Sequence, residues 1–482
     1  MENFLRGMLG MVALLGICYL FSNNKRAIDW KFVGIGLFAQ FMFATGVLDL
    51  RFNNVSIFWP VLITIVVVYI GIKIRSKERS TTKWGILITT FILCFLVIAN
   101  VLPQNSFAIA LQVVSKRFVD MINLSHKGTE FLFGNLADAN QSWGFVFAIQ
   151  VLPNIIFFAA LSAMLYYLGV LQKIVYVFAY LLRKLNISGP ESLSTSANIF
   201  LGQTEAPLMI KPYLDNLNRS EVLCIMIGGM ANTAGSVLAA YVTMLGGTDI
   251  GQQEYFALHL LSQSIMSAPA AIVCSKILFP QTSKDLTSEL KITDEKLGDN
   301  LLDAISLGTT DGLKLAVNVG AMLIAFTALI WVANGVLGWV GDVSMLNPII
   351  KSNTNYDALS IQMILGYIFS PVAWLIGVPP KDMLVVGQLL GEKTIINEFN
   401  AYITFANMKA DNMIQDPKSI LIVTYALSGF ANFASIGIQI GGISQLAPNQ
   451  RKNLTELGMK ALLGGTIATL LCATMVGMFY KN

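Results

Sequence analysis

The sequence predicts an all-α polytopic membrane protein, on the basis of its composition, its charge and the length of its apolar stretches. The chain has 482 residues, of which 55% are hydrophobic and only 12% are charged. A soluble chain would carry about a quarter charged residues. The charge-free stretches are mostly near the ~20 residues that cross the hydrocarbon core as a helix. The net charge of +4 is too small and too dispersed to indicate nucleic-acid binding.

Stretches without Asp, Glu, Lys or Arg are the candidate membrane spans, and we predict that ten of them cross the membrane. The stretch 358–380 contains Pro371, Pro379 and Pro380, so we expect it to lie at the interface or inside the protein instead. The candidates are residues 7–24, 32–48, 52–72, 84–115, 139–172, 222–248, 255–275, 315–341, 358–380, 419–450 and 461–480.

The basic residues predict the orientation of the chain in the membrane. Lysines and arginines follow the first, third and fifth spans and precede the last one, and these loops share one side if both termini are extracytoplasmic. We therefore expect a multi-pass protein of the cell inner (plasma) membrane. The loop 280–300, charged in both signs, is expected to be a cytoplasmic linker.

Two segments, 188–207 and 378–399, resemble each other and resist a simple helical interpretation because each contains glycines, prolines and carboxylates. Each is followed by a span with a small-polar interruption, at 229–236 and at 429–436. Each segment, with the spans around it, forms one repeat. Each repeat holds three spans, an odd number, so the second repeat must be inverted relative to the first. Inverted repeats with broken segments are typical of secondary transporters. We predict two re-entrant hairpins whose tips meet near the midplane; the alternative is a pair of cytosolic loops that are similar by chance.

The repeats also define the predicted domains. An even number of added spans near the N-terminus leaves the topology of the repeats unchanged. The domains are N-terminal scaffold spans at 1–140 with an extra helical hairpin at about 50–102 and an interfacial helix, repeat one at 141–280 with its hairpin at about 187–213, the cytoplasmic linker at 281–311, and repeat two at 312–482 with its hairpin at about 379–411.

Glu205 and Glu398 occupy equivalent places in the two hairpins. A carboxylate at membrane depth is costly and indicates function, although each could instead be an interfacial charge that reaches water. Carboxylates accept hydroxyl protons, and amides present a donor and an acceptor together. This set suits a neutral polyhydroxylated ligand with an amide-like edge, whose flat ring Phe430 could contact unless it only packs. The neighbouring amides and hydroxyls are Gln203, Thr204, Asn397, Asn432 and Ser435.

Asn198, the broken backbone near Leu201 and the pair Asn232-Thr233 offer oxygen atoms only. Hard monovalent cations bind such oxygens at unwound helices in transporters. The chain has two histidines and no Cys/His cluster, which argues against a transition-metal site. We found no nucleophile motif, phosphate loop or organic cofactor signature.

These motifs resemble those of a known family, the concentrative nucleoside transporters, in their bacterial sodium-coupled type. Residues 202–207 and 391–402 look like the two signature hairpins, and 429–433 and 128–134 are similar to further motifs of the family. The resemblance covers about residues 125–480 and the first span. It implies a homotrimer, an elevator motion of a transport domain past a scaffold, and carriage of a nucleoside with a cation.

The resemblance also implies roles for individual residues. Asn232 departs from it, because the family usually has Ser or Thr there, and the N-terminal part is too long by two spans. Gln203, Thr204 and Phe430 would face the nucleobase, Glu205, Glu398, Asn432 and Ser435 would hold the ribose, Val237 would line the pocket, and Asn198, Leu201, Asn232 and Thr233 would bind sodium.

The predicted function is import of uridine-like nucleosides with sodium, across a lipid bilayer and without nucleic acid as a partner. A first alternative is proton coupling, in which a carboxylate alternates its charge. A second alternative is a membrane-embedded enzyme acting on a nucleoside or sugar, which lacks a candidate nucleophile or cofactor loop. We therefore expect a transporter and no enzyme.

Overall fold

The computed structural model describes most of the chain and shows it to be almost entirely helical, which confirms the all-α prediction. The predicted extra hairpin at about 50–102 lies almost wholly outside the described residues, as does much of the linker. A two-residue pair of strands, β1 and β2, is the sheet found in the described part, with Arg51 opposite Ser56. The described residues are 2–48, 51–52, 55–56, 106–139, 141–183, 185, 187–282, 297–354 and 356–480.

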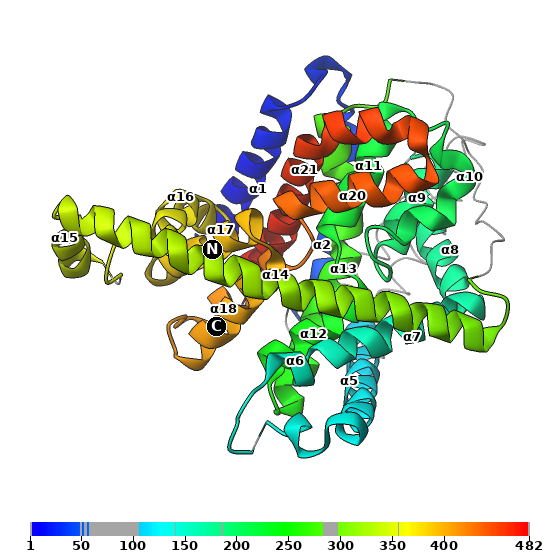
Figure 1. Cartoon of the computed structure of the whole chain (residues 1–482). Helices are drawn as coiled ribbons and strands as arrows, with labels where there is room; N and C mark the ends of the chain where they lie inside the picture. The colour runs from blue at the N-terminus through cyan, green and yellow to red at the C-terminus, as the bar shows by residue number, and fades with distance from the viewer. Residues whose placement is uncertain are drawn as a thin grey trace.

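The elements run in a single order from the N-terminus to the C-terminus (Figure 1). They are α1 (Glu2–Leu20), η1 (Lys25–Ala27), α2 (Trp30–Val47), β1 (Arg51–Phe52), β2 (Val55–Ser56), α5 (Ser106–Phe133), η2 (Gly134–Ala137), α6 (Phe147–Gln150), α7 (Leu152–Tyr167), α8 (Val170–Arg183), α9 (Gly189–Ala197), η3 (Ala206–Ile210), α10 (Lys211–Leu214), α11 (Arg219–Ala231), α12 (Gly235–Gly246), α13 (Ile250–Leu278), α14 (Leu301–Val343), α15 (Leu346–Asn353), α16 (Ile361–Leu375), η4 (Pro380–Asp382), α17 (Met383–Ile395), α18 (Glu398–Ala410), α19 (Pro417–Leu427), α20 (Phe433–Leu446), η5 (Pro448–Gln450) and α21 (Arg451–Phe479).

Among the described residues, seven helical stretches are long and apolar enough to cross a membrane. They correspond to the predicted spans in α1, α2, α6–α7, α11–α12, α13, α14 and α21. The predicted span 419–450 is divided between a short apolar helix, α19, and α20. The stretch 358–380 contains α16, a helix of only 15 residues with Pro371 inside it. It is too short for a simple span, as its prolines indicate.

The second half of the structure repeats the element order of the first half. A first helix (α7 or α14) and a shorter helix (α8 or α16) precede a helical hairpin. In hairpin one, α9 leads to a tip and returns through η3 and α10; in hairpin two, α17 leads to a tip and returns through α18. A broken helix then follows (α11–α12 or α19–α20), and a 29-residue helix (α13 or α21) ends each repeat.

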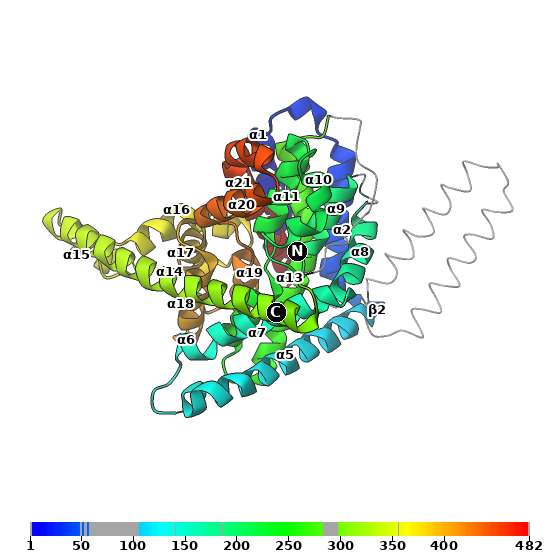
Figure 2. The ribbon, with the colours of Figure 1, turned by 45° about the vertical axis from the view of Figure 1, so that its right-hand side comes forward.

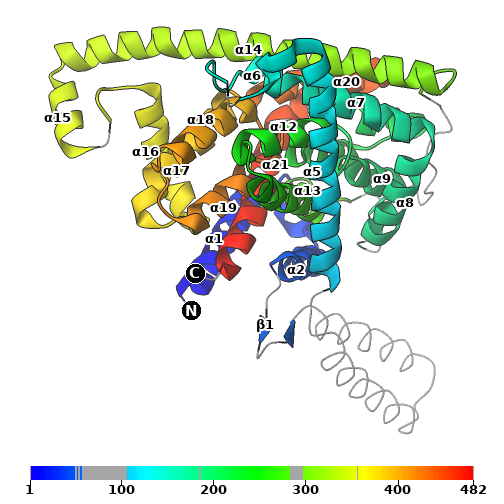
Figure 3. The same ribbon diagram turned by 90° about the horizontal axis from the view of Figure 1, so that it is seen from below.

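The first helices of the two repeats, α7 and α14, cross in close contact. A Cβ atom built on Gly308 would lie 2.5 Å from Ala163 Cβ, and one on Gly312 would lie 2.7 Å from Ala159 Cβ. Small residues spaced by four along a helix let two backbones approach in this way. Beyond the crossing, the 43-residue α14 runs along one edge of the molecule and carries α15 at its far end (Figure 3).

The long helices α13 and α21 form the centre of the molecule. Helices α1, α11 and α19 pack against α21, and α2, α11 and α12 pack against α13. Their buried apolar side chains form one core that includes both broken helices. The long helix α5 lies obliquely across one end of this bundle (Figure 2), where it contacts α13, α7 and α2.

Candidate functional site

The two helix breaks touch each other, although they lie about 200 residues apart in the sequence. The hydroxyl of Thr233, in the first break, accepts a hydrogen bond from Gly429 N at 2.9 Å and pairs with Ser428 Oγ at 2.8 Å. Gly429 has φ +94°, and a Cβ atom there would lie 2.7 Å from Ala231 O. Only glycine allows this backbone conformation and this approach. The two helix breaks therefore meet in the structure.

Gln263 of α13 joins the two breaks, and sequence reasoning missed it. Its Nε2 donates to Ala231 O at 3.1 Å, and its Oε1 accepts from Ser428 Oγ at 2.7 Å. Gln263 lies between two serines of α13 and belongs to no recognised motif. Its role comes only from the position of α13 beside both breaks.

Glu398 is placed by the turn at the tip of hairpin two. The Asn397 side chain accepts from Asn400 N at 2.8 Å and so caps α18, which makes Glu398 the first residue of that helix. A carboxylate is favoured at a helix N-terminus by the helix dipole. Glu398 is buried, and its Oε2 accepts from Asn432 Nδ2 at 2.5 Å. Hairpin two is thereby joined to the break between α19 and α20.

A chain of hydrogen bonds continues from Glu398 to the tip of hairpin one. Asn432 Oδ1 accepts from Ser435 N at 2.9 Å, which caps α20. Ser435 Oγ in turn accepts from Gln203 Nε2 at 3.3 Å. Four of the predicted nucleoside-binding residues, drawn from both hairpins and from one break, are thus linked directly.

The tip of hairpin one packs against glycines of both repeats. A Cβ atom on Gly229 of α11 would lie 2.9 Å from Gln203 Cβ, and one on Gly442 of α20 would lie 2.6 Å from Thr204 Cγ2. These two glycines therefore seat the tip between a helix of each repeat. Gln203 Oε1 is buried and has no hydrogen-bond partner within the described ranges.

The remaining predicted nucleoside-binding residues lie outside the hydrogen-bonded chain. Glu205 is exposed, and its carboxylate folds back over Gly202, where a Cβ atom would lie 2.1 Å from Oε2. Val237 and Phe430 are buried in the main apolar core. Tyr241, one turn after Val237 on α12, was not predicted; its ring stacks on Tyr402 with centroids 4.1 Å apart.

The predicted cation ligands lie at the end of α11. Asn198 and Thr195 of hairpin one both approach Gly228, at 3.4 and 3.5 Å from a Cβ atom built there. Asn198 Oδ1 and Thr195 Oγ1 are buried, and neither has a hydrogen-bond partner in the part of the chain that the structure describes. The side chain of Leu201 packs among apolar residues of α8, so Leu201 can offer only its backbone oxygen. Unpartnered buried oxygens of this kind suit a hard monovalent cation.

The Asn232 side chain is longer than the Ser or Thr that is usual in the family, and it makes a contact that the sequence did not predict. Its Nδ2 donates to Gly228 O at 3.1 Å, and its Oδ1 accepts from Ser267 Oγ of α13 at 2.5 Å. The neighbouring Thr233 hydroxyl is engaged with the second break. Asn232 and Thr233 therefore have their side-chain oxygens already in use, and their main-chain oxygens remain for a cation. Within the described residues no cluster of His, Cys, Asp or Glu could hold a metal ion.

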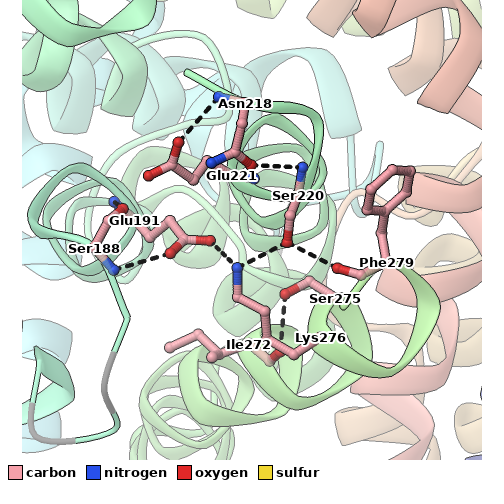
Figure 4. Close-up of polar contacts among 9 residues, drawn as sticks. All are labelled: Ser188, Glu191, Asn218, Ser220, Glu221, Ile272, Ser275, Lys276 and Phe279. Atoms are coloured by element: carbon pink, nitrogen blue, oxygen red, sulfur yellow. Dashed lines mark hydrogen bonds and ion pairs between the residues drawn. The ribbon is translucent and has the colours of Figure 1, made fainter. Parts of the chain in front are cut away.

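The base of hairpin one is fastened to two other helices by a buried ion pair (Figure 4). Ser188 N donates to Glu191 Oε2 at 3.0 Å, and Glu191 N donates to Ser188 Oγ at 3.3 Å, which forms a capping box on α9. Lys276 of α13 pairs with Glu191 Oε1 and donates to Ser220 Oγ, at the start of α11, at 3.0 Å. The Glu191 side chain is fully buried. The base of hairpin one is thus linked to both α11 and α13.

A cavity with a volume of about 790 Å³ lies elsewhere in the described part of the chain. It separates α5, η2 and α6 from the ends of α12 and α18, and His126, Glu130, Gln150, Thr243 and Asn407 are among its lining residues. None of the predicted nucleoside or cation residues lines it. This cavity is therefore separate from the hydrogen-bonded junction of the hairpins and the helix breaks.

Comparisons with protein families cover most of the chain. The family models described as "Na+ dependent nucleoside transporter N-terminus" and "C-terminus" match residues 9–59 with 63–136, and 259–477. A model described as "Nucleoside recognition" matches residues 148–248, which include hairpin one and the first break.

Relatives and solved structures agree with the family models. The nucleoside permease NupC of Helicobacter pylori is 36% identical over 77% of this chain and 85% of its own. The sodium/nucleoside cotransporter 1 of Rattus norvegicus is 35% identical over 84% of this chain and 61% of its own. Similar structures include CNTnw in an inward-facing substrate-bound state, with 33% identity, a TM-score of 0.78 and 98% of both chains covered. A CNTnw variant in an outward-facing state has 33% identity and a TM-score of 0.80 over 99% of this chain and 98% of that one.

The family models and the relatives name transporters, in agreement with the helices that are long and apolar enough to cross a membrane. The hairpins and the broken helices lie in the matched regions. This multi-pass chain belongs to the concentrative nucleoside transporter family, whose models are described as sodium-dependent, and is a nucleoside transporter rather than an enzyme.

Proposed function

We propose that this protein imports uridine-like nucleosides and that the junction of the two hairpins with the two helix breaks is its binding site. The observation that carries the proposal is the hydrogen-bonded chain from Glu398 through Asn432 and Ser435 to Gln203. A ligand that replaces some of these bonds would connect both repeats. Its binding would therefore close the junction.

The chemistry of the junction assigns a role to each side chain. Glu398, Asn432 and Ser435 hold the ribose hydroxyls, because a carboxylate accepts two such protons and the amide and hydroxyl can both donate and accept. Gln203 and Thr204 contact the nucleobase from the tip of hairpin one. The orphan Gln203 Oε1 supplies an acceptor for a base N–H.

Three further residues complete the proposed site. Phe430 lies against the base ring and Val237 against its edge, since both border the breaks. Glu205 reaches the ribose from hairpin one once its exposed carboxylate turns inward from Gly202.

Sodium is the proposed coupling ion, held by Asn198 and by main-chain oxygens of Leu201, Asn232 and Thr233. Two observations support it: the unpartnered Asn198 Oδ1 and the family described as sodium-dependent. The ion would fix the start of the hairpin-one tip, five residues before Gln203. Ion and nucleoside would then favour each other's binding, and by linkage to the same extent.

We further propose an elevator motion in which the hairpins and broken helices move together past α7 and α14. The supporting observation is the closely packed crossing of α7 and α14. Most of the apolar surface of α14 is uncovered in a single chain, since only 11% of the residues in its apolar stretch are buried. Two further copies in a homotrimer would cover part of it, and a native mass of three chains in detergent would test this. We also propose that the protein lies in the inner (plasma) membrane and that both of its termini are outside the cytoplasm.

A binding titration tests the proposal. Uridine is titrated into purified protein at fixed pH, in sodium and in potassium, and uridine affinity is expected to be higher in sodium. Uridine binding that responds to pH and ignores sodium would favour the proton-coupled alternative. No uridine binding in either salt would contradict the proposed substrate class.

A further inference from the structure

A buried lysine near the tip of hairpin two has no role in the function described so far. Lys393 lies in the last turn of α17 and is 2% exposed. Its Nζ donates to Ala426 O at 2.8 Å, to Ser428 O at 3.2 Å and to Thr469 Oγ1 at 3.3 Å. An ammonium has three protons to donate, so these acceptors satisfy it fully.

Two of the acceptors belong to the end of a broken helix. Helix α19 ends at Leu427, and its last carbonyl groups have no partner within the helix. These carbonyls also carry the negative end of the helix dipole. At membrane depth such groups must be satisfied by protein, water or ligand. The Lys393 ammonium satisfies them from hairpin two.

Repeat one has the same arrangement without the positive charge. Helix α11 also ends at a break. The first arm of hairpin one, α9, lies against the last turn of α11 through Asn198. Here the donors to the terminal carbonyls are neutral amides: Asn232 Nδ2 bonds Gly228 O, and Gln263 Nε2 bonds Ala231 O. Among the described residues no lysine or arginine hydrogen-bonds to this end of α11.

The last helix of each repeat completes the correspondence. Near the middle of α13, Ser267 donates to Asn232 of the first break. Near the middle of α21, Thr469 accepts from Lys393 beside the second break. Each repeat therefore brings together a hairpin arm, a broken helix end and a hydroxyl from its last helix. The two clusters differ in charge. The cluster of repeat two contains the Lys393 ammonium, and the cluster of repeat one contains the unpartnered oxygens of Asn198 and Thr195.

We propose that Lys393 is a tethered cation that does in repeat two what the bound sodium ion does in repeat one. It binds hairpin two to the end of α19 in every state of the transport cycle. Hairpin one alone then responds to the ion. Lys393 is thus a positioning residue, which acts on the nucleoside through Glu398, five residues further along the same hairpin. This inference rests on the proposed function.

Chemical rescue of Lys393→Ala tests the inference. Truncation removes the ammonium and leaves space and three acceptors, so uridine affinity should fall about tenfold or more, as expected for lost charged hydrogen bonds. Ethylammonium should restore affinity several-fold, whereas the bulkier tetraethylammonium should not. Lys393→Met, whose side chain fills the space, should lose affinity without rescue. Lys381→Ala is the matched control, because this lysine at the base of the same hairpin is about half exposed.

The outcomes separate this inference from the proposed function. Failure of the wild-type protein to bind uridine would contradict the proposed function itself. Sodium-dependent binding by the wild type, together with a folded Lys393→Ala variant that binds normally or ignores ethylammonium, would overturn only the role of Lys393. If Lys393→Ala does not fold, Thr469→Val removes one acceptor and keeps the ammonium. Several-fold weaker uridine binding by Thr469→Val would support the inference, and unchanged binding would overturn it.

Discussion

At the scale of single residues, the account depends most on the Glu398 carboxylate. Replacing it in Glu398→Gln keeps the shape but exchanges an acceptor oxygen for a donor. Charged hydrogen bonds contribute about 1.5–3 kcal/mol, so uridine affinity should fall roughly tenfold to a hundredfold. Isothermal titration in sodium measures this change.

A matched control lies in the same hairpin. Glu392 is equally buried, and its carboxylate accepts from Gln388 Nε2 at 2.9 Å and from Asn400 Nδ2 at 3.1 Å, outside the proposed site. Glu392→Gln should leave uridine affinity within a few-fold of the wild type. Equal losses in both variants would mean that Glu398 acts through the fold of the hairpin.

Asn198 is the residue on which the sodium proposal depends. Asn198→Ala removes the unpartnered oxygen, so the gain in uridine affinity on adding sodium should disappear while weak binding remains. Uridine titrations at several sodium concentrations and one pH measure this dependence. A sodium response that survives in Asn198→Ala would exclude this position as a ligand.

Residue roles could be predicted from the sequence where a motif fixes the neighbours. Asn432 and Ser435 lie at and just after a helix break, and the sequence predicts them near Glu398. In the structure Asn432 bonds Glu398 directly, and Ser435 is linked to Glu398 through Asn432. Lys393 lies within the signature motif at 391–402, but its partners are defined only when α19 and α21 pack around it. Ser267 could not be found, since its partner depends on how α13 lies against the break.

At the scale of elements, two adjacent glycines of α20 test how hairpin one is seated. A Cβ atom on Gly442 would lie 2.6 Å from Thr204 Cγ2, whereas one on Gly441 meets no atom within 4 Å. Gly442→Ala should therefore displace the hairpin tip and weaken uridine binding severalfold, and Gly441→Ala should not. Similar affinities for the two variants would show that Thr204 does not depend on this contact.

The ion pair at the base of hairpin one makes a prediction about stability. Lys276→Met leaves the Glu191 carboxylate buried without its partner, which should lower the free energy of unfolding by roughly 3–5 kcal/mol. The double variant with Glu191→Gln removes both charges and should recover much of this loss. Thermal unfolding in detergent compares them. A double variant as unstable as Lys276→Met would show that the lysine acts by packing alone.

The order of elements was more predictable than their lengths. The two helix breaks could be predicted because the glycine-rich and polar interruptions at 229–236 and 429–436 end a helix through local interactions alone. In contrast, α14 was expected as a span at 315–341, and it begins at Leu301 because its first turns pack on α7 through Gly308 and Gly312. Such lengths are set by tertiary contacts between distant segments.

At the scale of the whole molecule, the central claim is that nucleoside transport is driven by sodium. A protein whose ion site and nucleoside site lie at one junction should accumulate uridine against its gradient when sodium flows inward. The proposed ligands, neutral oxygens of Asn198 and of the main chain, can bind a metal cation but cannot themselves carry a proton. The ion gradient that drives uptake therefore distinguishes this account from proton coupling.

The most direct measurement is uptake of labelled uridine into proteoliposomes under imposed gradients. An inward sodium gradient at equal pH should concentrate unchanged uridine above its outside level, and an inward proton gradient without sodium should give equilibration at most. Accumulation that follows the proton gradient and ignores sodium would contradict the account.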